Sequence, residues 1–163
     1  MSERRETLKN YLTLPVIKTL DKQAIEHNIP HRDPFLLVDE VRVLEEKKKY
    51  VGVRRVRADE YYFNGHFPQK PIMQGVLVVE SISQAFGGAI MGYITQGGGG
   101  LPLFLSIDEA KFRGMVVPGD LLEMPIEIIR FGKISKIYAE AYVNGKLCTQ
   151  ASLTFILGET PHA

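Results

Sequence analysis

Nearly every position between Gly75 and Thr95 is apolar, and this run separates two halves of the chain that are richer in polar residues. A helix that is hydrophobic almost all round belongs in a core rather than on a surface. At this length it would span about 30 Å, the width of a small domain. The residues just before it include Gly65, Pro68 and Pro71, so we expect a loop there.

Alternation of apolar and polar residues predicts strands on both sides of this helix. The expected strands cover residues 35–44, with an irregularity at Asp39-Glu40, and residues 50–56, 102–107, 109–113, 121–128, 137–143 and 147–155. Pro125 marks an edge strand or a bulge, because proline cannot donate to a sheet ladder. Asn144-Gly145 predicts a type I′ hairpin, and Pro118-Gly119 predicts a type II turn. Asp21 is expected to cap a short helix over residues 22–27, and the four glycines at 97–100 predict a loop.

One apolar helix cannot bury itself, and a curved antiparallel sheet is the wrapper that the remaining chain offers. We therefore predict an α+β fold with the long helix in the concavity of the sheet. The expected organisation is an N-terminal extension (1–24), one domain (25–158) and a short tail (159–163).

Composition favours a soluble cytoplasmic protein. The net charge of +1 argues against a nucleic-acid partner. Cys148 is the one cysteine, so no intrachain disulfide can form, and the histidines show no zinc-ligand spacing. The first ten residues are charged and lack the apolar core of a signal peptide. Polar residues near Glu80 argue against a membrane span.

Candidate chemistry gathers at the start of the long helix. His66 suits proton transfer near neutral pH, and Glu80 lies in the second turn of an apolar helix, where a carboxyl must be paired or protonated. The N–H of Gly75, in the first turn, can polarise a carbonyl oxygen. Together these groups would suit removal of a proton beside a carbonyl, coupled to loss or gain of water.

Structural interpretations of the same residues stay open on these grounds alone. His66 could be a hydrogen-bonding residue of a Gly/Pro loop, and Gly75 could simply permit helix entry. Glu80, Ser83, Gln84 and Gly87 share one helix face and could form a narrow solvent-facing stripe. We expect Cys148, His31 and Arg32 to have structural roles.

Several motifs resemble the FabZ family of (3R)-hydroxyacyl-[acyl-carrier-protein] dehydratases. The matching motifs are Gly65-His66-Phe67-Pro68-x-Lys70-Pro71-Ile72-x-x-Gly75-Val76-Leu77 with Glu80 and Gln84, Pro30-His31-Arg32-x-Pro34-Phe35-Leu36-Leu37-Val38-Asp39, Ile107-Asp108-Glu109-Ala110-Lys111-Phe112, Val117-Pro118-Gly119-Asp120 and Asn144-Gly145-Lys146. The resemblance covers residues 25–155 and implies a hot-dog fold.

The resemblance also implies the reaction and its residues. His66 would be the base at the α-carbon, Glu80 would help the β-hydroxyl leave, and the Gly75 N–H would hold the thioester carbonyl. Phe67 and Val76 would contact the substrate beside them. No metal or cofactor is implied, because phosphopantetheine arrives on acyl carrier protein. The family further implies a homodimer, usually a trimer of dimers, in which His66 of one subunit works with Glu80 of the other.

The chain departs from the family at a few positions. Gln74 stands where proline is usual, which bears on how the helix begins, Asp33 replaces a usual aromatic, and Leu103-Phe104 replaces an aromatic pair. Glu80 is not a departure, since the related dehydratase/isomerases are the group with aspartate at this position, and it favours dehydration without isomerisation. Acyl-chain length, pathway and the role of residues 1–20 stay undetermined by the sequence.

Two other functions share this fold. A hot-dog thioesterase would use a carboxylate to activate water, and an acyl-thioester-binding module would bind without turnover. The presence of both His66 and Glu80 favours the dehydratase. Acidic acyl carrier protein is expected to dock on basic residues near the tunnel mouth, namely Lys111, Arg113, Arg130, Lys133 and Lys136. A solvated basic face would look the same.

Overall fold

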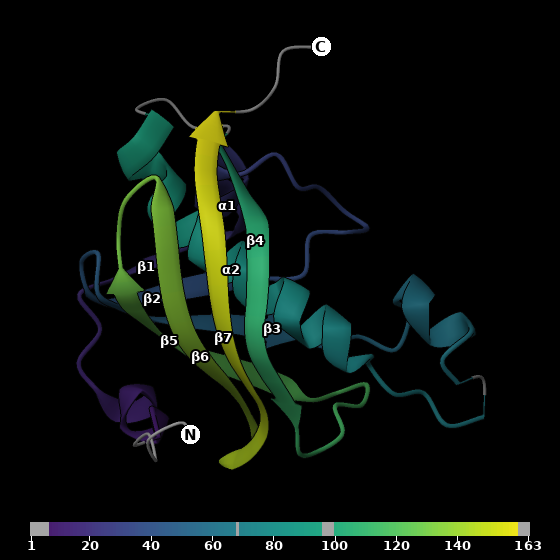
Figure 1. Cartoon of the computed structure of the whole chain (residues 1–163). Coiled ribbons are helices and arrows are strands. Elements are labelled where there is room, and N and C mark those ends of the chain that lie inside the picture. The colour runs from purple at the N-terminus through teal and green to yellow at the C-terminus, as the bar shows by residue number, and fades with distance from the viewer. Residues whose placement is uncertain (1–6, 68, 96–99, 160–163) are drawn as a thin grey trace.

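The structure is a computed structural model that describes residues 7–67, 69–95 and 100–159, and it contains one antiparallel sheet of seven strands. The elements in chain order are η1 (Lys9–Thr13), β1 (Lys18–Leu20), α1 (Lys22–Asn28), β2 (Glu40–Glu45), β3 (Lys49–Arg55), η2 (Tyr61–Asn64), α2 (Gly75–Thr95), β4 (Gly100–Phe112), β5 (Leu121–Arg130), β6 (Ile134–Val143) and β7 (Lys146–Glu159), where η denotes a 3₁₀ helix. The strand order is β1-β2-β3-β5-β6-β7-β4 (Figure 1).

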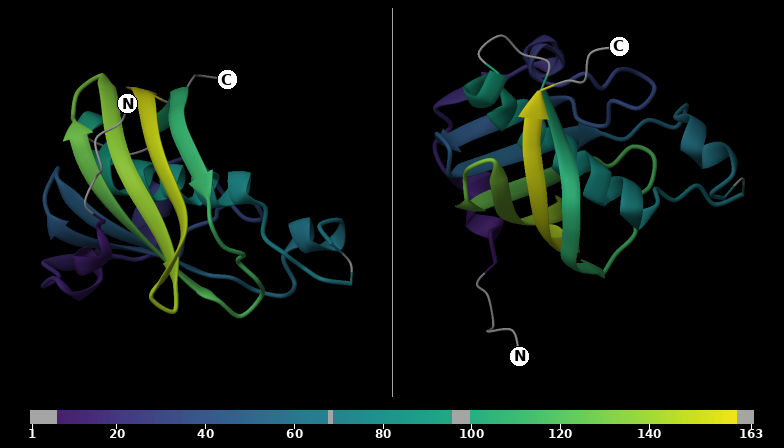
Figure 2. Two further views of the ribbon diagram at one scale, coloured as in Figure 1. Left: turned by 60° about the horizontal axis from the view of Figure 1, so that its bottom comes forward. Right: turned by 45° about the horizontal axis from the view of Figure 1, so that its top comes forward.

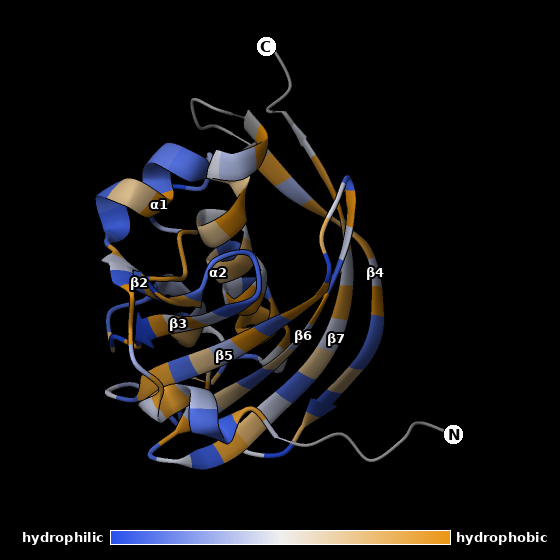
Figure 3. Ribbon diagram, turned by 90° about the vertical axis from the view of Figure 1, so that its left-hand side faces the viewer, coloured by the Kyte–Doolittle hydropathy of each residue, from blue (hydrophilic) through white to orange (hydrophobic). Residues whose placement is uncertain are grey.

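The long helix α2 lies in the concavity of the sheet, as predicted (Figure 3). Its apolar side chains form the main core with the inward-facing residues of the strands, and Phe86 stacks on Phe155 at 4.9 Å between ring centroids. Gly52 of β3 faces the helix so closely that a Cβ there would lie 2.6 Å from Ala85 Cβ. By length and composition α2 could also span a membrane, but most of it is buried inside this protein.

The sequence-based strand assignment is wrong at Phe35–Asp39. β2 begins only at Glu40, and the preceding residues pack against α2 outside the sheet. The N–H of Leu37 donates to the side chain of Gln84 at 2.6 Å rather than to a strand. An apolar run therefore identified burial here but not the strand conformation.

Two expectations about irregular strands also change. The strands predicted at 102–107 and 109–113 are one edge strand, β4, with register shifts between Phe104 and Ser106 and between Ile107 and Glu109. Pro125 lies in a central strand, opposite Val51, and not at an edge or a bulge. The β5–β6 pairing keeps its register from Glu123↔Tyr142 to Ile126↔Ala139 but is interrupted between them, as expected where Pro125 has no N–H to donate.

The turn predictions are confirmed. Asn144 and Gly145 both have positive φ (51° and 76°), as a type I′ hairpin requires, and Gly119 has φ 93°. The Asp21 side chain accepts the N–H of Ala24 at 2.9 Å and caps α1. The loop predicted at 97–100 lies outside the described residues except for Gly100, where β4 begins.

The N-terminal extension is part of the fold rather than a separate segment. β1 pairs with β2 at one edge of the sheet, and a boundary at residue 24 would fall inside α1. Before β1, Leu8 and Tyr11 pack on the outer face of the sheet, against a cluster that includes Val51 and Val53. The first described residues thus cover the face opposite α2.

Between β3 and α2 the chain leaves the sheet and returns. We call this segment, residues 56–74, the His66 arm. It contains η2 and projects away from the sheet, which both views of Figure 2 show in blue-teal. The arm returns at Met73, whose N–H donates to Val116 O at 2.8 Å.

Candidate active site

His66 lies in the middle of the arm, just after η2, and its ring is held in one orientation. Its Nδ1 lies 2.9 Å from the carbonyl oxygen of Ile72, and the Ile72 N–H donates to His66 O at 3.0 Å. The ring stacks on Phe67 with 4.1 Å between centroids. A carbonyl at Nδ1 favours the tautomer that carries its proton there, which leaves Nε2 free to accept a proton.

A cavity of about 410 Å³ opens between His66 and the N-terminus of α2. Its lining is mostly apolar and comprises His66, Ile72, Met73, Gln74, Gly75, Val76, Val78, Phe112, Gly114, Met115, Val116 and Thr149. Gly75 and Val76, two of the predicted substrate contacts, are therefore at the cavity. The third, Phe67, supports the ring of His66 and is not among the lining residues.

Packing gives a reason for glycine at position 75. A Cβ at this position would lie 2.4 Å from Cδ1 of Phe112, whose ring covers the start of the helix. Within the described residues the N–H groups of Gly75 and Val76 have no hydrogen-bond partner, whereas those of Leu77 and Val78 donate to Gln74 O. Helix entry is regular with glutamine at position 74, and the Gly75 N–H is one of two first-turn donors left for a ligand.

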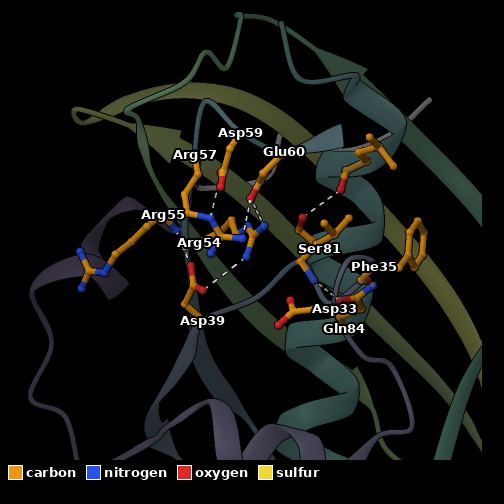
Figure 4. Close-up of polar contacts among 12 residues, drawn as sticks. Asp33, Phe35, Asp39, Arg54, Arg55, Arg57, Asp59, Glu60, Ser81 and Gln84 are labelled. Atoms are coloured by element: carbon orange, nitrogen blue, oxygen red, sulfur yellow. Dashed lines mark hydrogen bonds and ion pairs between the residues drawn. The ribbon is translucent and has the colours of Figure 1, made fainter. Parts of the chain in front are cut away.

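Glu80 occupies a second, separate environment on α2. Its side chain is mostly buried, and burial raises the pKa of the Glu80 carboxyl while a hydrogen bond from Gln84 opposes that rise. Gln84 Nε2 donates to Phe35 O at 2.8 Å (Figure 4). It also donates to Glu80 Oε2 at 2.8 Å, and Gln84 Oε1 accepts the Leu37 N–H. The Gln84 side chain thus links the Glu80 carboxyl to the backbone of residues 35–37. The face of α2 that carries Glu80, Ser83, Gln84 and Gly87 is therefore not a solvent-facing stripe.

His31 also lies beside this carboxyl, a placement that the sequence did not predict. Its Nε2 is 3.8 Å from Glu80 Oε2, and burial, with Arg32 next to it, lowers the pKa of His31. Arg32 caps the end of α1 by donating to Ile29 O and Glu26 O, which is the structural role expected for it. Cys148 is buried and bonds Ala141 O, also as expected.

A single chain does not bring His66 and Glu80 together. Glu80 is not among the residues that line the cavity at His66, and its polar contacts are with His31 and Gln84. His66 and Glu80 are therefore each held by their own contacts, but in separate environments near the start of α2. In the described parts of the chain, no three His, Cys, Asp or Glu side chains are grouped as around a metal ion.

Comparison with known proteins places this site in a family. The model of the FabA-like domain matches residues 29–152. The 3-hydroxyacyl-[acyl-carrier-protein] dehydratase FabZ of Desulforamulus reducens is 45% identical over 141 residues, which cover 86% of this chain and 99% of that protein. The FabZ of Clostridium botulinum strain Kyoto is 44% identical over 143 residues, or 87% and 99%. The chain belongs to the FabZ family.

Solved structures support the hot-dog fold of this FabZ-family chain. The dehydratase heterocomplex ApeI:P from Xenorhabdus doucetiae superposes with a TM-score of 0.68 at 15% identity, covering 85% of this chain and 91% of that one. The uncharacterized protein PH1136 from Pyrococcus horikoshii superposes with a TM-score of 0.54 at 13% identity, covering 90% and 97%. At such identities the likeness concerns the fold alone.

The basic residues expected at the tunnel mouth of this FabZ-family chain do not form one group. Lys111 and Arg113 flank Phe112, which lines the cavity. The strand register places Lys111 opposite Gln150 and Leu103 opposite Ile156, and Ile156 pairs with Ile134 at the start of β6. Arg130 and Lys133 lie beside Ile134, at the end of the sheet near Leu103. That end is roughly 25 Å along the strand from Lys111.

Proposed function

We propose that this chain is a lyase that removes water from (3R)-3-hydroxyacyl-[acyl-carrier-protein] to give the trans-2-enoyl thioester in fatty-acid biosynthesis. The observation that carries the proposal is the cavity at the start of α2, which joins an oriented histidine to a helix N–H without a partner. Membership of the FabZ family supports the same reaction.

In this reaction His66 Nε2 takes the proton from the α-carbon, and the electrons of that C–H bond form the double bond. The Cβ–O bond breaks, and the hydroxyl leaves as water with a proton from Glu80. The raised pKa of Glu80 favours the protonated carboxyl that this step needs. The Gly75 N–H, at the positive end of the helix dipole, stabilises the charge that develops on the thioester oxygen. No oxidation or reduction occurs, so the step needs no redox cofactor, and in the proposed mechanism His66, Glu80 and the Gly75 N–H supply the proton transfers and the charge stabilisation without a metal.

The second catalytic group would come from another copy of the chain. β4 ends the sheet, with β7 on one side and no strand of the described residues on the other. Its exposed side chains include Leu103, Phe104, Leu105, Ile107 and Phe112. A long apolar edge of this kind invites a partner. Pairing of β4 with its copy would join two sheets and could bring the His66 arm of one subunit to Glu80 of the other, and we propose this homodimer, itself assembled as a trimer of dimers.

Carrier protein would deliver the substrate to this dimer. Of the five basic residues expected at the tunnel mouth, Lys111 and Arg113 flank Phe112, which lines the cavity, so we restrict the proposed docking site to them. Opposite charge on the carrier would raise the association rate more than the affinity. A protein with a single buried cysteine, Cys148, suits the cytoplasm, where we place the enzyme.

Product analysis tests this function directly. The wild-type protein is incubated with a short trans-2-enoyl thioester in water, the reverse direction, and both products and free thiol are quantified. We expect the 3-hydroxyacyl thioester and no thiol above the buffer control. Thiol release would indicate the alternative thioesterase, and binding of the thioester without turnover would indicate a non-catalytic module.

A further inference from the structure

A buried ion pair stands where the His66 arm leaves the sheet. Arg54, the penultimate residue of β3, is 2% exposed, and its guanidinium reaches the carboxylates of both Asp39 and Glu60. The contact from Nη1 to Asp39 Oδ1 is 3.3 Å, and Nη2 contacts Glu60 Oε1 directly. Arg57 approaches Glu60 at 3.9 Å from the solvent side (Figure 4).

Folding alone does not explain this arrangement. Removing an arginine and a carboxylate from water is costly, and well-packed apolar residues commonly serve stability as well. The cost is visible here, because Arg54 Nε and Glu60 Oε2 are buried with no hydrogen-bond partner among the described residues. What a guanidinium adds over apolar packing is direction, since its donors are fixed in one plane.

That direction is passed to the arm through the main chain. Glu60 immediately precedes η2, and its carbonyl accepts the N–H of Phe63 at 3.1 Å. Tyr62 and Phe63 are both buried. The turn after Glu60 is therefore held by the ion pair with Arg54 and by the packing of these two aromatic side chains. His66 follows three residues later, and between it and Glu60 the chain makes only this one turn.

The same guanidinium also holds the segment that fixes Glu80. Asp39 bonds Arg54 through one oxygen and the N–H of Arg55 through the other, at 2.6 Å. Two residues before Asp39 lies Leu37, whose N–H is bound by the side chain of Gln84. Arg54 therefore ties the base of the His66 arm to the segment packed against Gln84, which fixes Glu80.

We propose that Arg54 and Glu60 are positioning residues, whose ion pair sets the direction of the His66 arm so that His66 meets the substrate in the partner's site. This inference rests on the function and the dimer proposed above. A shift of about 1 Å in a reacting group can cost about a hundredfold in rate. We therefore expect Glu60→Gln to lower kcat at least about tenfold while KM stays within about threefold.

The first test compares Glu60→Gln with Asp59→Asn, a neutralised carboxylate next to it that is 82% exposed. Both proteins are checked by circular dichroism and thermal melting. The proposal predicts the tenfold fall only for Glu60→Gln. If this variant misfolds, Arg54→Met with Glu60→Leu removes both charges and leaves no unpaired one between them. A folded variant with kcat within twofold of wild type would overturn the proposal.

The second test separates positioning from general stability. His66→Ala and Glu80→Gln subunits are each inactive, but a mixed dimer holds one site with both groups intact. Glu60→Gln is then added to either chain. In the Glu80→Gln chain it sits on the arm that supplies His66 and should lower the recovered activity about tenfold. In the His66→Ala chain it should change recovery less than twofold, and equal effects in both placements would contradict positioning.

A third measurement does not depend on activity. Amide hydrogen exchange over residues 61–66 should be at least about tenfold faster in Glu60→Gln, with β5 unchanged as the internal control. Unchanged exchange would overturn the proposal even if the reaction were different. Absence of recovery from the parental mixture would instead contradict the shared dimer site, and the kcat and exchange comparisons would still decide the role of Glu60.

Discussion

Gly75 is constrained by packing at the same position where we propose a chemical role for its N–H. From the sequence, Gly75 could be a helix-entry glycine or an N–H donor to substrate. The structure adds a further reason for glycine, because the ring of Phe112 leaves no room for a Cβ. Phe112 comes from the end of β4, far along the chain, so no local pattern could relate the two. The ring and the free N–H together shape the cavity.

Gly75→Ala is therefore predicted to damage activity more than stability. The new methyl group must displace the ring of Phe112. Because this ring is half-exposed, it can move at little cost in stability. Because it also lines the cavity, its displacement changes the shape of the cavity and narrows it. We expect kcat/KM to fall at least about a hundredfold, with a small change in melting temperature. Gly75→Ala combined with Phe112→Ala should recover part of the loss, and full activity in the single variant would contradict this view of the cavity.

Glu80 gives a pH-dependent prediction. Burial raises the pKa of this carboxyl above its ordinary value of 4.5, so its charged form is disfavoured in the folded protein. Its contribution to stability is complete below pH 4.5 and is lost as the pH rises through the folded pKa. Glu80→Gln cannot ionise and keeps the acceptor for Gln84. Its melting temperature should exceed that of wild type at pH 8, and the difference should vanish near pH 4. A pH-independent difference would show that burial does not shift Glu80.

Among the elements, those with strong local signals were predictable. The bounds of α2 follow from a mostly apolar run, and the hairpin at Asn144-Gly145 follows from turn chemistry. The Phe35–Asp39 segment was not predictable as a non-strand, because the N–H of Leu37 at its centre bonds the side chain of Gln84, and only Asp39, at its end, donates to β3, at Val53 O. Periodicity reports which residues are buried, and only the tertiary structure decides which partner satisfies their backbone.

The role of the N-terminal segment, residues 8–16, could not be predicted from the sequence. Leu8 and Tyr11 cover the outer face of the sheet, where the fully buried Glu140 accepts hydrogen bonds from the Leu8 N–H and from two tyrosine hydroxyls, those of Tyr138 and Tyr142. The carboxylate thus lies under the segment, with donors on more than one side. We call this segment, residues 8–16, the strap. It packs on the outer face of the sheet, opposite α2.

Tyr11→Ala should consequently destabilise the protein without reducing activity. Loss of a buried aromatic side chain costs about 3 kcal/mol, measured as the free energy of unfolding in urea. Val16→Ala is the matched control, since Val16 is exposed in the same segment, and should cost less than about 0.5 kcal/mol. Equal effects of the two substitutions would show that the strap does not hold the sheet.

At the scale of the whole molecule, the sequence identified the catalytic residues that we propose but not how they meet. His66 and Glu80 lie in separate environments of one chain, and only the family resemblance implied that the partner completes the site. The exposed apolar edge of β4 is the structural feature that agrees with such an assembly. Spacing along a sequence cannot reveal a contact between two copies of it.

The most direct test of the account is turnover of (3R)-3-hydroxyacyl-[acyl-carrier-protein], followed by the absorbance of the enoyl thioester, with wild type, His66→Ala and Glu80→Gln compared. We predict enoyl product from wild type and a loss of at least about a thousandfold in each folded variant, because each removes one of the two proton-transfer groups. Absence of enoyl product from the folded wild type, or wild-type rates in either variant, would contradict it.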